Sequence, residues 1–343
     1  MKSKLYTKST EAWDAMLGAI DQAENSVLIE MYIFEADTAE SHDFLGKLKR
    51  KSSEGVKIVI VADAFGSKLL QKEADDLRGS GIEIIFFSHW LRHIHRKILV
   101  VDGRTAFIGG VNIGKRFENW NDLHLRLGGA IVKRILKSFA YTYEMAGGKD
   151  EFVLAWRKRK FSYKLRFWLV EHLPSRNIHT LRRHYAERIL GAQKSVRIVT
   201  PYFAPPRWLI SLLDDAIRRG IGVEILVPEK SDFPFADRIN FHYMEKLHPL
   251  GMRPFLTKEM NHAKLLIIDD EEALIGSQNL DPLSFEINVE AGIFFKDKAL
   301  IRELLETYQN WKNDSVEFVP GRYKKRIVDY AIVLLGKIFY PVL

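Results

Sequence analysis

The sequence has 343 residues, which is long enough for two ordinary domains or for one large domain with a duplicated core. Hydrophobic residues make up 47% and charged residues 28%, a globular composition that argues against a disordered chain. The absence of cysteine excludes disulfides, thiolate metal sites and a cysteine nucleophile. The net charge of +8 favours an anionic partner, either nucleic acid or anionic lipid, and charge alone does not distinguish them.

The first 90 residues alternate between helical and extended patterns. Such alternation predicts an α/β fold in which a mixed, mostly parallel sheet is covered by helices on both faces. Helices are predicted over 9–24, 39–53 and 66–79, and strands over 26–34, 56–62 and 82–87.

A hairpin is predicted next, because the apolar run 97–101 is followed by the turn dipeptide Asp102-Gly103 and a second apolar run. Its first arm carries His95 and Lys97. Residues i and i+2 of a strand point to the same side, so this imidazole and this ammonium group are expected to project together.

Residues 148–180 interleave cations with aromatic residues, as in the run Trp156-Arg157-Lys158-Arg159-Lys160. Such a segment can bind phosphates or lie on an anionic membrane, and a solvated helix face is the alternative interpretation. The alternation then resumes. Helices are predicted over 181–193, 206–219 and 234–247, strands over 195–199 and 222–227, and a second hairpin from 263–268.

The two halves of the chain are duplicates. When they are aligned with an offset of 167 residues, Gly55-Val56-Lys57-Ile58 meets Gly222-Val223-Glu224-Ile225. One offset that holds over about 60 residues is not expected by chance and indicates an internal repeat. The other aligned pairs are His95 with His262, Lys97 with Lys264, Asp102 with Asp269, Gly109 with Gly276, and Asn112 with Asn279.

The doubled His-Lys pair predicts chemistry at a phosphodiester. Such a displacement needs a nucleophile, an acid for the leaving alkoxide, and cations for the non-bridging oxygens. Two imidazoles can divide the first two tasks between them, and two lysines supply the charge. The side chains of Asn112, Ser277 and Asn279 add hydrogen-bond donors for the phosphate.

We expect neither a metal ion nor another cofactor. His93 and His95 form an i, i+2 pair, but no third ligand follows at the spacing of a zinc site.

The motif from His95 to Gly103, continued by 107–113, resembles the first catalytic element of the phospholipase D superfamily. Its sequence is most similar to that of the bacterial cardiolipin synthase branch. The resemblance spans roughly residues 10–312. Half one has Gly110 where many members have Ser, and Leu283 stands where the branch often has Arg. The other matching segments are 120–124, 200–205, 262–269, 276–279 and 288–290.

The resemblance implies two similar halves, packed as a pseudo-twofold sandwich with one active site at their interface. It implies that a carboxylate downstream of each motif orients the histidine of the same half, which maps to Asp122 for His95 and to Glu290 for His262. It also implies that His95 is the nucleophile. Within the two candidate catalytic elements, Asp102 and Asp269 then look structural.

We therefore expect four segments: a first phospholipase D-like half at 1–147, a connecting insert at 148–180, a second half at 181–315, and a basic and apolar tail at 316–343. The tail fits an interfacial helix or a final helix packed on the core. The chain starts without the apolar segment of a signal peptide and contains no run of 18 apolar residues. A peripheral protein on the cytoplasmic face of an anionic phospholipid membrane is the expectation, and the oligomeric state is left open.

The leading functional hypothesis is a phosphatidyltransferase that works through a phosphohistidine and makes cardiolipin from phosphatidylglycerol and a second phospholipid. A phospholipase D that releases phosphatidic acid would use the same residues with water as acceptor. A superfamily nuclease would use the positive charge for DNA, although small nucleases of this kind usually carry one motif per chain. A binding protein with a relic site would be expected to have lost one of the motif residues, and both motifs are intact.

Overall fold

The computed structural model describes residues 3–69, 71–161 and 166–321. The chain divides into two compact units, which are described separately: unit 1 is Met1–Asn119 with Leu123–Leu169, and unit 2 is Trp120–Asp122 with Val170–Leu343. None of the helices in the described ranges is both long and apolar enough to cross a bilayer. Of the predicted tail, residues 322–343 lie outside the described residues.

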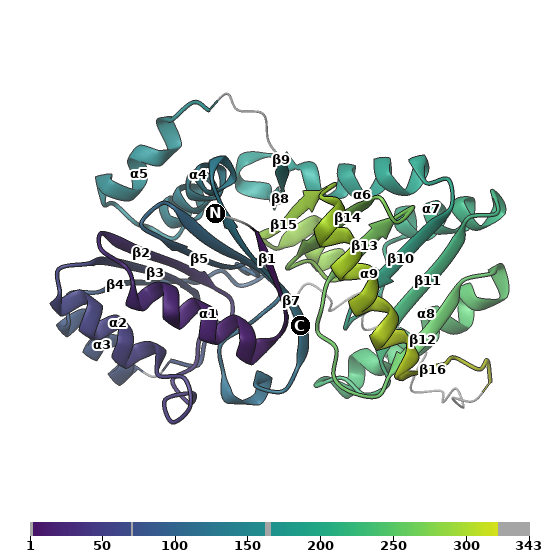
Figure 1. Ribbon diagram of the computed structural model, residues 1–343, viewed down its shortest axis with the longest axis horizontal. Coiled ribbons are helices and arrows are strands. Elements are labelled where there is room, and N and C mark those ends of the chain that lie inside the picture. The colour runs from purple at the N-terminus through teal and green to yellow at the C-terminus, as the bar shows by residue number, and fades with distance from the viewer. Residues whose placement is uncertain (1–2, 70, 162–165, 322–343) are drawn as a thin grey trace. The chain divides into compact units, whose positions relative to one another are not determined.

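Unit 1 contains a mixed sheet with the strand order β1-β7-β6-β5-β2-β3-β4 (Figure 1). Strands β2, β3 and β4 are parallel, whereas β5, β6 and β7 continue the sheet in antiparallel pairs. The strands are β1 (Lys4–Lys8), β2 (Ser26–Met31), β3 (Lys57–Asp63), β4 (Glu83–Phe87), β5 (Lys97–Val101), β6 (Thr105–Gly109) and β7 (Asn121–Gly128).

The helices of unit 1 bury amphipathic faces on this sheet. The predicted helix 39–53 begins only at residue 44, because the side chain of Asp43 accepts a hydrogen bond from the amide of Gly46 at 2.7 Å and caps the helix there. The helices are α1 (Ser9–Asp21), α2 (Phe44–Ser53), α3 (Gln71–Gly79), α4 (Ala130–Met145), α5 (Glu151–Lys158) and the 3-10 turn η1 (Lys115–Phe117).

Unit 2 repeats this arrangement in a sheet with the order β16-β12-β11-β10-β13-β14-β15-β8-β9. Strands β10, β11 and β12 are parallel, and the other described pairs are antiparallel. The strands are β8 (Phe167–Leu173), β9 (Ile178–His179), β10 (Ser195–Val199), β11 (Gly222–Pro228), β12 (Arg253–Thr257), β13 (Leu265–Ile268), β14 (Glu272–Gly276), β15 (Glu290–Phe295) and β16 (Ser315–Glu317).

The mixed sheets and covering helices confirm the predicted fold class, with one correction. Parallel pairing does not predominate in either sheet, because each helix-connected block of three strands is followed by a hairpin, and hairpins pair antiparallel.

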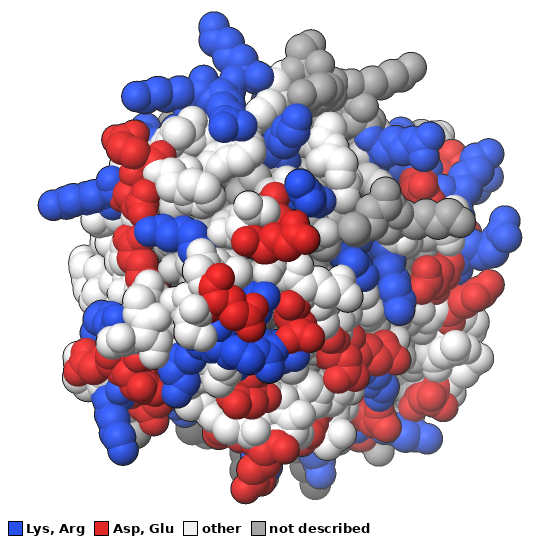
Figure 2. Space-filling view, turned by 60° about the vertical axis from the view of Figure 1, so that its left-hand side comes forward, with Lys and Arg blue, Asp and Glu red and all other residues white. Residues whose placement is uncertain are grey.

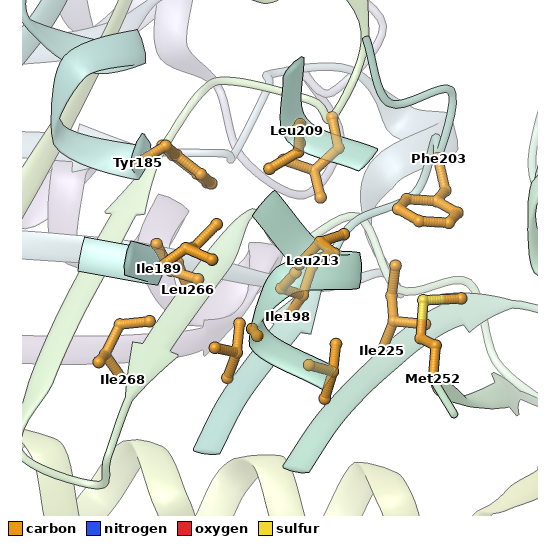
Figure 3. Close-up of a cluster of buried hydrophobic side chains, with 14 of the residues drawn as sticks. Tyr185, Ile189, Ile198, Phe203, Leu209, Leu213, Ile225, Met252, Leu266 and Ile268 are labelled. Atoms are coloured by element: carbon orange, nitrogen blue, oxygen red, sulfur yellow. The ribbon is translucent and has the colours of Figure 1, made fainter. Parts of the chain in front are cut away.

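One core cluster of unit 2 lies between the sheet and helices α6, α7 and α8. Figure 3 shows side chains of α6 and α7 meeting those of the strands, and burial of each such aliphatic side chain contributes about 1.5–3 kcal/mol. The helical segments are α6 (Thr180–Gly191), α7 (Arg207–Arg218), α8 (Pro234–Leu247), α9 (Lys298–Asn313), the 3-10 turns η2 (Pro174–Arg176) and η3 (His248–Leu250), and the π-helical turn η4 (Leu283–Ile287).

The predicted insert 148–180 contains regular structure. Its first part is the capped helix α5, which buries Val153 and Leu154 and leaves most of its polar residues at the surface. Its last part supplies β8 and β9 to the sheet of unit 2. Arg159 lies 4.0 Å from the ring of Trp156, so this cation and this ring contact each other.

The positive charge of the chain is not concentrated on the face shown in Figure 2. Lys and Arg side chains are interspersed there with Asp and Glu side chains. A net charge of +8 therefore produces no single basic patch on this face.

Candidate functional site

Both His-Lys pairs lie at the same edge of their respective sheets. Strand β5 runs antiparallel to β2, with Lys97 opposite Met31, so the start of β5 lies at the carboxyl ends of β2, β3 and β4. In unit 2, β13 starts opposite Val199 at the carboxyl end of β10, directly after Lys264. The carboxyl edge of parallel strands is where ligands bind in many α/β proteins.

In unit 1, Lys97 is fully buried beside His95. Its Nζ donates a hydrogen bond to the carbonyl oxygen of His95 at 2.6 Å and lies 4.9 Å from the centre of the Tyr32 ring. The Tyr32 ring also packs edge-on against the His95 ring at 4.7 Å. Sequence reasoning missed Tyr32, although its place directly after β2, opposite the start of β5, was a usable signal.

Asp63 is a second residue that sequence reasoning missed. This buried carboxylate ends β3, and its Oδ2 accepts a hydrogen bond from the amide of Ile94 at 2.8 Å. Its Oδ1 lies 3.2 Å from Nδ1 of His93. Asp63 thus fixes the segment that leads into His95, and His93 is held by a carboxylate.

In unit 2, His262 is oriented by Asp122. Nδ1 of His262 lies 2.7 Å from Oδ2 of Asp122, and both side chains are buried. The backbone fixes this pair as well, because the amide of His262 donates to Asn121 and the amide of Asn121 donates to Met260. Trp120 adds a ring contact at 5.4 Å.

The predicted assignment of Asp122 to His95 is therefore wrong. The repeat implied that each carboxylate serves the histidine of its own half. Instead, residues 120–122 pair with the backbone around Asn261 and belong to unit 2, which brings Asp122 to His262. A carboxylate at Nδ1 fixes the tautomer of the imidazole and assigns the reactive proton or lone pair to Nε2.

Lys264 is buried next to this pair and donates a hydrogen bond to the carbonyl oxygen of His262. Burial lowers the pKa of Lys264 to about 8, although the carboxylates of Asp122, Glu290, Asp232 and Asp281 act in the opposite direction. The pKa of this ammonium group is thus well below that of an exposed lysine.

Glu290 is buried and accepts hydrogen bonds from two hydroxyl groups. Its Oε1 accepts a hydrogen bond from Ser284 at 2.9 Å, and its Oε2 accepts one from Ser277. It was predicted to orient His262, but Asp122 holds Nδ1 of that ring.

Burial raises the pKa of the neighbouring Asp281 to about 6. Ser284 and Asp281 were not among the predicted site residues, although both lie close to Leu283, the position where the branch often has Arg.

The predicted phosphate-binding residues Asn112 and Asn279 are both buried. In both side chains the amide oxygen has no hydrogen-bond partner among the described residues. Buried amide oxygens are normally paired, so a donor such as water or a ligand hydroxyl would complete this arrangement, whereas a phosphate oxygen would not. Ser277, the third predicted residue, is committed to Glu290.

Asp102 and Asp269 bind backbone. Asp102 accepts hydrogen bonds from three consecutive amides, at residues 24–26, and Asp269 does the same for residues 193–195. Burial alone would raise the pKa of each, but the backbone donors outweigh it and both pKa values are lowered. Each carboxylate thus ties its hairpin turn to the start of a neighbouring strand.

Gly109 and Gly276 allow close strand packing at matched positions. A Cβ at Gly109 would lie 2.2 Å from the carbonyl oxygen of Leu123, and one at Gly276 would lie 2.7 Å from that of Ala291. Each carbonyl belongs to the residue that follows Asp122 or Glu290. The two glycines therefore let the carboxylate-bearing strands approach the hairpins.

Comparison with known proteins identifies the family of this chain. A family model described as "Cardiolipin synthase, PLD-like domain" matches residues 16–141 and 185–311, which include both His-Lys pairs. Probable cardiolipin synthase YwiE of Bacillus subtilis (strain 168) is 29% identical, over 99% of this chain and 72% of that protein. A cardiolipin synthase of Listeria monocytogenes serotype 4b (strain CLIP80459) is 28% identical, over 94% of this chain and 71% of that protein.

Among solved structures, the phosphatidylserine synthase of Haemophilus influenzae Rd KW20 has a similar fold. Its TM-score is 0.76 at 16% identity, and the match covers 98% of this chain and 92% of that one. At this identity the likeness concerns the fold alone. The family match shows more, since it spans most of the chain and both motifs: this chain belongs to the cardiolipin synthase family with its phospholipase D-like domains, a family of phosphatidyltransferase enzymes.

Proposed function

We propose that this enzyme makes cardiolipin by transferring a phosphatidyl group from one phospholipid to the hydroxyl of phosphatidylglycerol. The observation that carries the proposal is the family match across both halves, with both His-Lys pairs intact. The names of the relatives from Bacillus and Listeria support the same substrate class.

In the proposed mechanism both elements act on one phosphodiester. A ring nitrogen of His95 attacks phosphorus, the bond to the leaving alkoxide breaks, and His262 gives its proton to that alkoxide. The phosphatidyl group is then held on His95 by a P–N bond. His262 next removes the proton of the incoming hydroxyl, its oxygen attacks phosphorus, and the P–N bond breaks to release the product and free His95.

Contacts within unit 2 support giving His262 the acid and base role. The buried Asp122 at Nδ1 favours the imidazolium form that must donate a proton from Nε2. Lys97 and Lys264 supply positive charge for the non-bridging oxygens, and the amides of Asn112 and Asn279 supply donors. We also propose that the protein acts as a peripheral enzyme on the cytoplasmic face of an anionic phospholipid membrane.

The test incubates the purified chain with phosphatidylglycerol vesicles, with and without a second phospholipid, and resolves the lipids by mass spectrometry. Cardiolipin should appear with the wild type and disappear with His95→Ala and with His262→Ala. Phosphatidic acid as the only product would replace the transferase with a hydrolase. Cleavage of single-stranded DNA at low salt without any lipid product would replace it with a nuclease.

The phosphohistidine is tested separately by rapid acid-free quenching and intact-protein mass spectrometry. A phosphatidyl adduct should map to His95. An adduct that persists in His95→Ala and maps to His262 would reverse the two roles.

A further inference from the structure

Two loops of unit 1 carry the most exposed large hydrophobic side chains among the described residues. Trp90 is 78% exposed and Phe65 is 64% exposed. Phe65 lies in the loop that follows β3, and Trp90 lies in the loop between β4 and β5. Both loops leave the carboxyl ends of parallel strands, so both lie at the sheet edge where β5 begins with Lys97.

Hydrogen bonds hold these two loops in place. Oδ1 of Asp63 accepts from the amides of Phe65 and Gly66, both at 3.0 Å, while its Oδ2 accepts from Ile94. Nδ1 of His89 accepts from the backbone amides of residues 91 and 92, which closes a turn around Trp90. Hydrogen-bonded turns therefore hold the two aromatic rings at the surface, where they leave apolar area exposed to water.

A series of ring contacts connects the exposed ring of Phe65 to His95, the candidate nucleophile. The ring of Phe65 lies 5.0 Å from that of His93, and His93 lies 6.2 Å from Tyr32. Tyr32 in turn packs against His95 at 4.7 Å. The loop that carries Phe65 is thus joined to His95 by side-chain packing within unit 1.

The two exposed loops carry cations and no carboxylate. Residues 64–69 and 88–93 contain no aspartate or glutamate, whereas the loop after β2 at the same edge carries the exposed Asp37 and Glu40. The loops do contain Lys68 and Arg92 next to the aromatic residues. Aromatic rings flanked by cations and free of carboxylates match the boundary between headgroups and acyl chains of an anionic bilayer.

The basic and aromatic segment at α5 lies at the opposite edge of the same sheet. Trp156 lies near Gly103 in the turn that ends β5, and Asp150 pairs with Lys57 at the start of β3. A bilayer that meets the edge with His95 is therefore not met by α5 at the same time. This separation makes α5 a matched internal control.

We propose that the loops 64–69 and 88–93 form the membrane-docking surface of this enzyme, with Phe65 and Trp90 inserted at the headgroup boundary of an anionic phospholipid bilayer. This inference rests on the proposed function, because a lipid substrate must reach His95 from that bilayer. It identifies the partner as an anionic bilayer and the docking surface as loops 64–69 and 88–93.

The experiment uses the full chain and measures flotation with vesicles of phosphatidylglycerol and phosphatidylcholine, compared with vesicles of phosphatidylcholine alone. Trp90→Ala and Phe65→Ala should each weaken the apparent affinity for the anionic vesicles by about tenfold, the loss expected for one partly buried ring. The matched control Phe152→Ala removes a ring that is 48% exposed on α5 and should leave the affinity unchanged.

Depth is read from tryptophan fluorescence with phospholipids brominated near the headgroup. Quenching should be clearly smaller in Trp90→Ala than in the wild type. Unchanged thermal unfolding midpoints would show that the variants are folded, as expected for side chains this exposed.

Equal vesicle affinity of the wild type and the Phe65→Ala, Trp90→Ala double variant would overturn the proposal. An equal loss in Phe152→Ala would overturn it too, and so would a loss of single-stranded DNA binding without a loss of vesicle binding. Vesicle binding needs no turnover. A protein that makes no cardiolipin but loses binding in Trp90→Ala would refute the proposed activity and keep the docking surface.

Discussion

Asp122 and His262, 140 positions apart in the sequence, form a buried hydrogen bond of 2.7 Å between Oδ2 and Nδ1. The pair is enclosed by backbone hydrogen bonds between residues 120–122 and 260–262. A histidine–carboxylate pair of this kind stabilises the imidazolium and fixes its tautomer. It is the part of the site with the most direct consequence for catalysis.

Replacing Asp122 by Asn should lower kcat by about 10²–10⁴-fold, because the amide carries no charge and can present a donor to Nδ1. The expected readout is the rate of cardiolipin formation under saturating phosphatidylglycerol, together with its pH profile. Asp122→Glu keeps the charge and should recover part of the rate. If Asp122→Glu lost as much rate as Asp122→Asn, and the pH profile of the remaining activity were unchanged, Asp122 would have only a structural role.

The two turn carboxylates should matter for stability. Asp269→Ala removes three backbone hydrogen bonds and places alanine at a φ of 57°, so the free energy of unfolding should fall by about 1–3 kcal/mol. Urea denaturation measures this fall. The neighbouring exposed Glu271→Ala is the control and should change little. A fall in kcat without a fall in stability would instead make Asp269 catalytic.

The low pKa of Lys264, about 8, predicts a falling limb in the pH dependence of activity. As pH rises through this value the ammonium group loses its proton and no longer offers charge to the phosphate. Asp232→Asn removes a carboxylate that raises this pKa, so the limb should move to lower pH.

Tyr202→Phe is the matched control for Asp232→Asn. It breaks the hydrogen bond between Tyr202 and Asp232, 2.6 Å long, but keeps the charge. The limb should therefore stay in place in Tyr202→Phe. An equal shift in both variants would assign the limb to loop structure and not to Lys264.

The buried Asp281 predicts a stability that depends on pH in the acid range. Its folded-state pKa is about 6, above the ordinary value of 3.8 for an aspartate, so the folded state binds more protons between these values and stability falls as pH rises through this window. Asp281→Asn resembles the protonated form. At pH 7 it should be more stable than the wild type by on the order of 1–3 kcal/mol.

Thermal or urea unfolding at pH 4 and at pH 7 checks this prediction. The stability difference between variant and wild type should shrink at the lower pH, where the wild-type carboxyl is protonated. A difference that is the same at both values would mean that Asp281 does not titrate in this window.

The sequence alone determined the features that follow from local pattern. Helical and strand periodicity placed most elements, and helix 234–247 was placed at both ends as the structure has it, in α8. The constant offset between the halves identified His95, Lys97, His262 and Lys264. The prediction that both residues of each pair lie on the first arm of a hairpin was wrong in extent. Strand β5 begins at Lys97 and β13 begins after Lys264, so His95, His262 and Lys264 precede their strands.

Only the tertiary structure decided that Asp122 meets the imidazole of His262. The link between Asp122 and His262 depends on the pairing of two segments far apart in the chain, and a repeat offset carries no information about such pairing. Tyr32 and Asp63 were decided in the same way, because their roles arise from strand ends that come together at one edge of the sheet. Local periodicity sets how a residue points along its own strand, and long-range packing sets what it meets there.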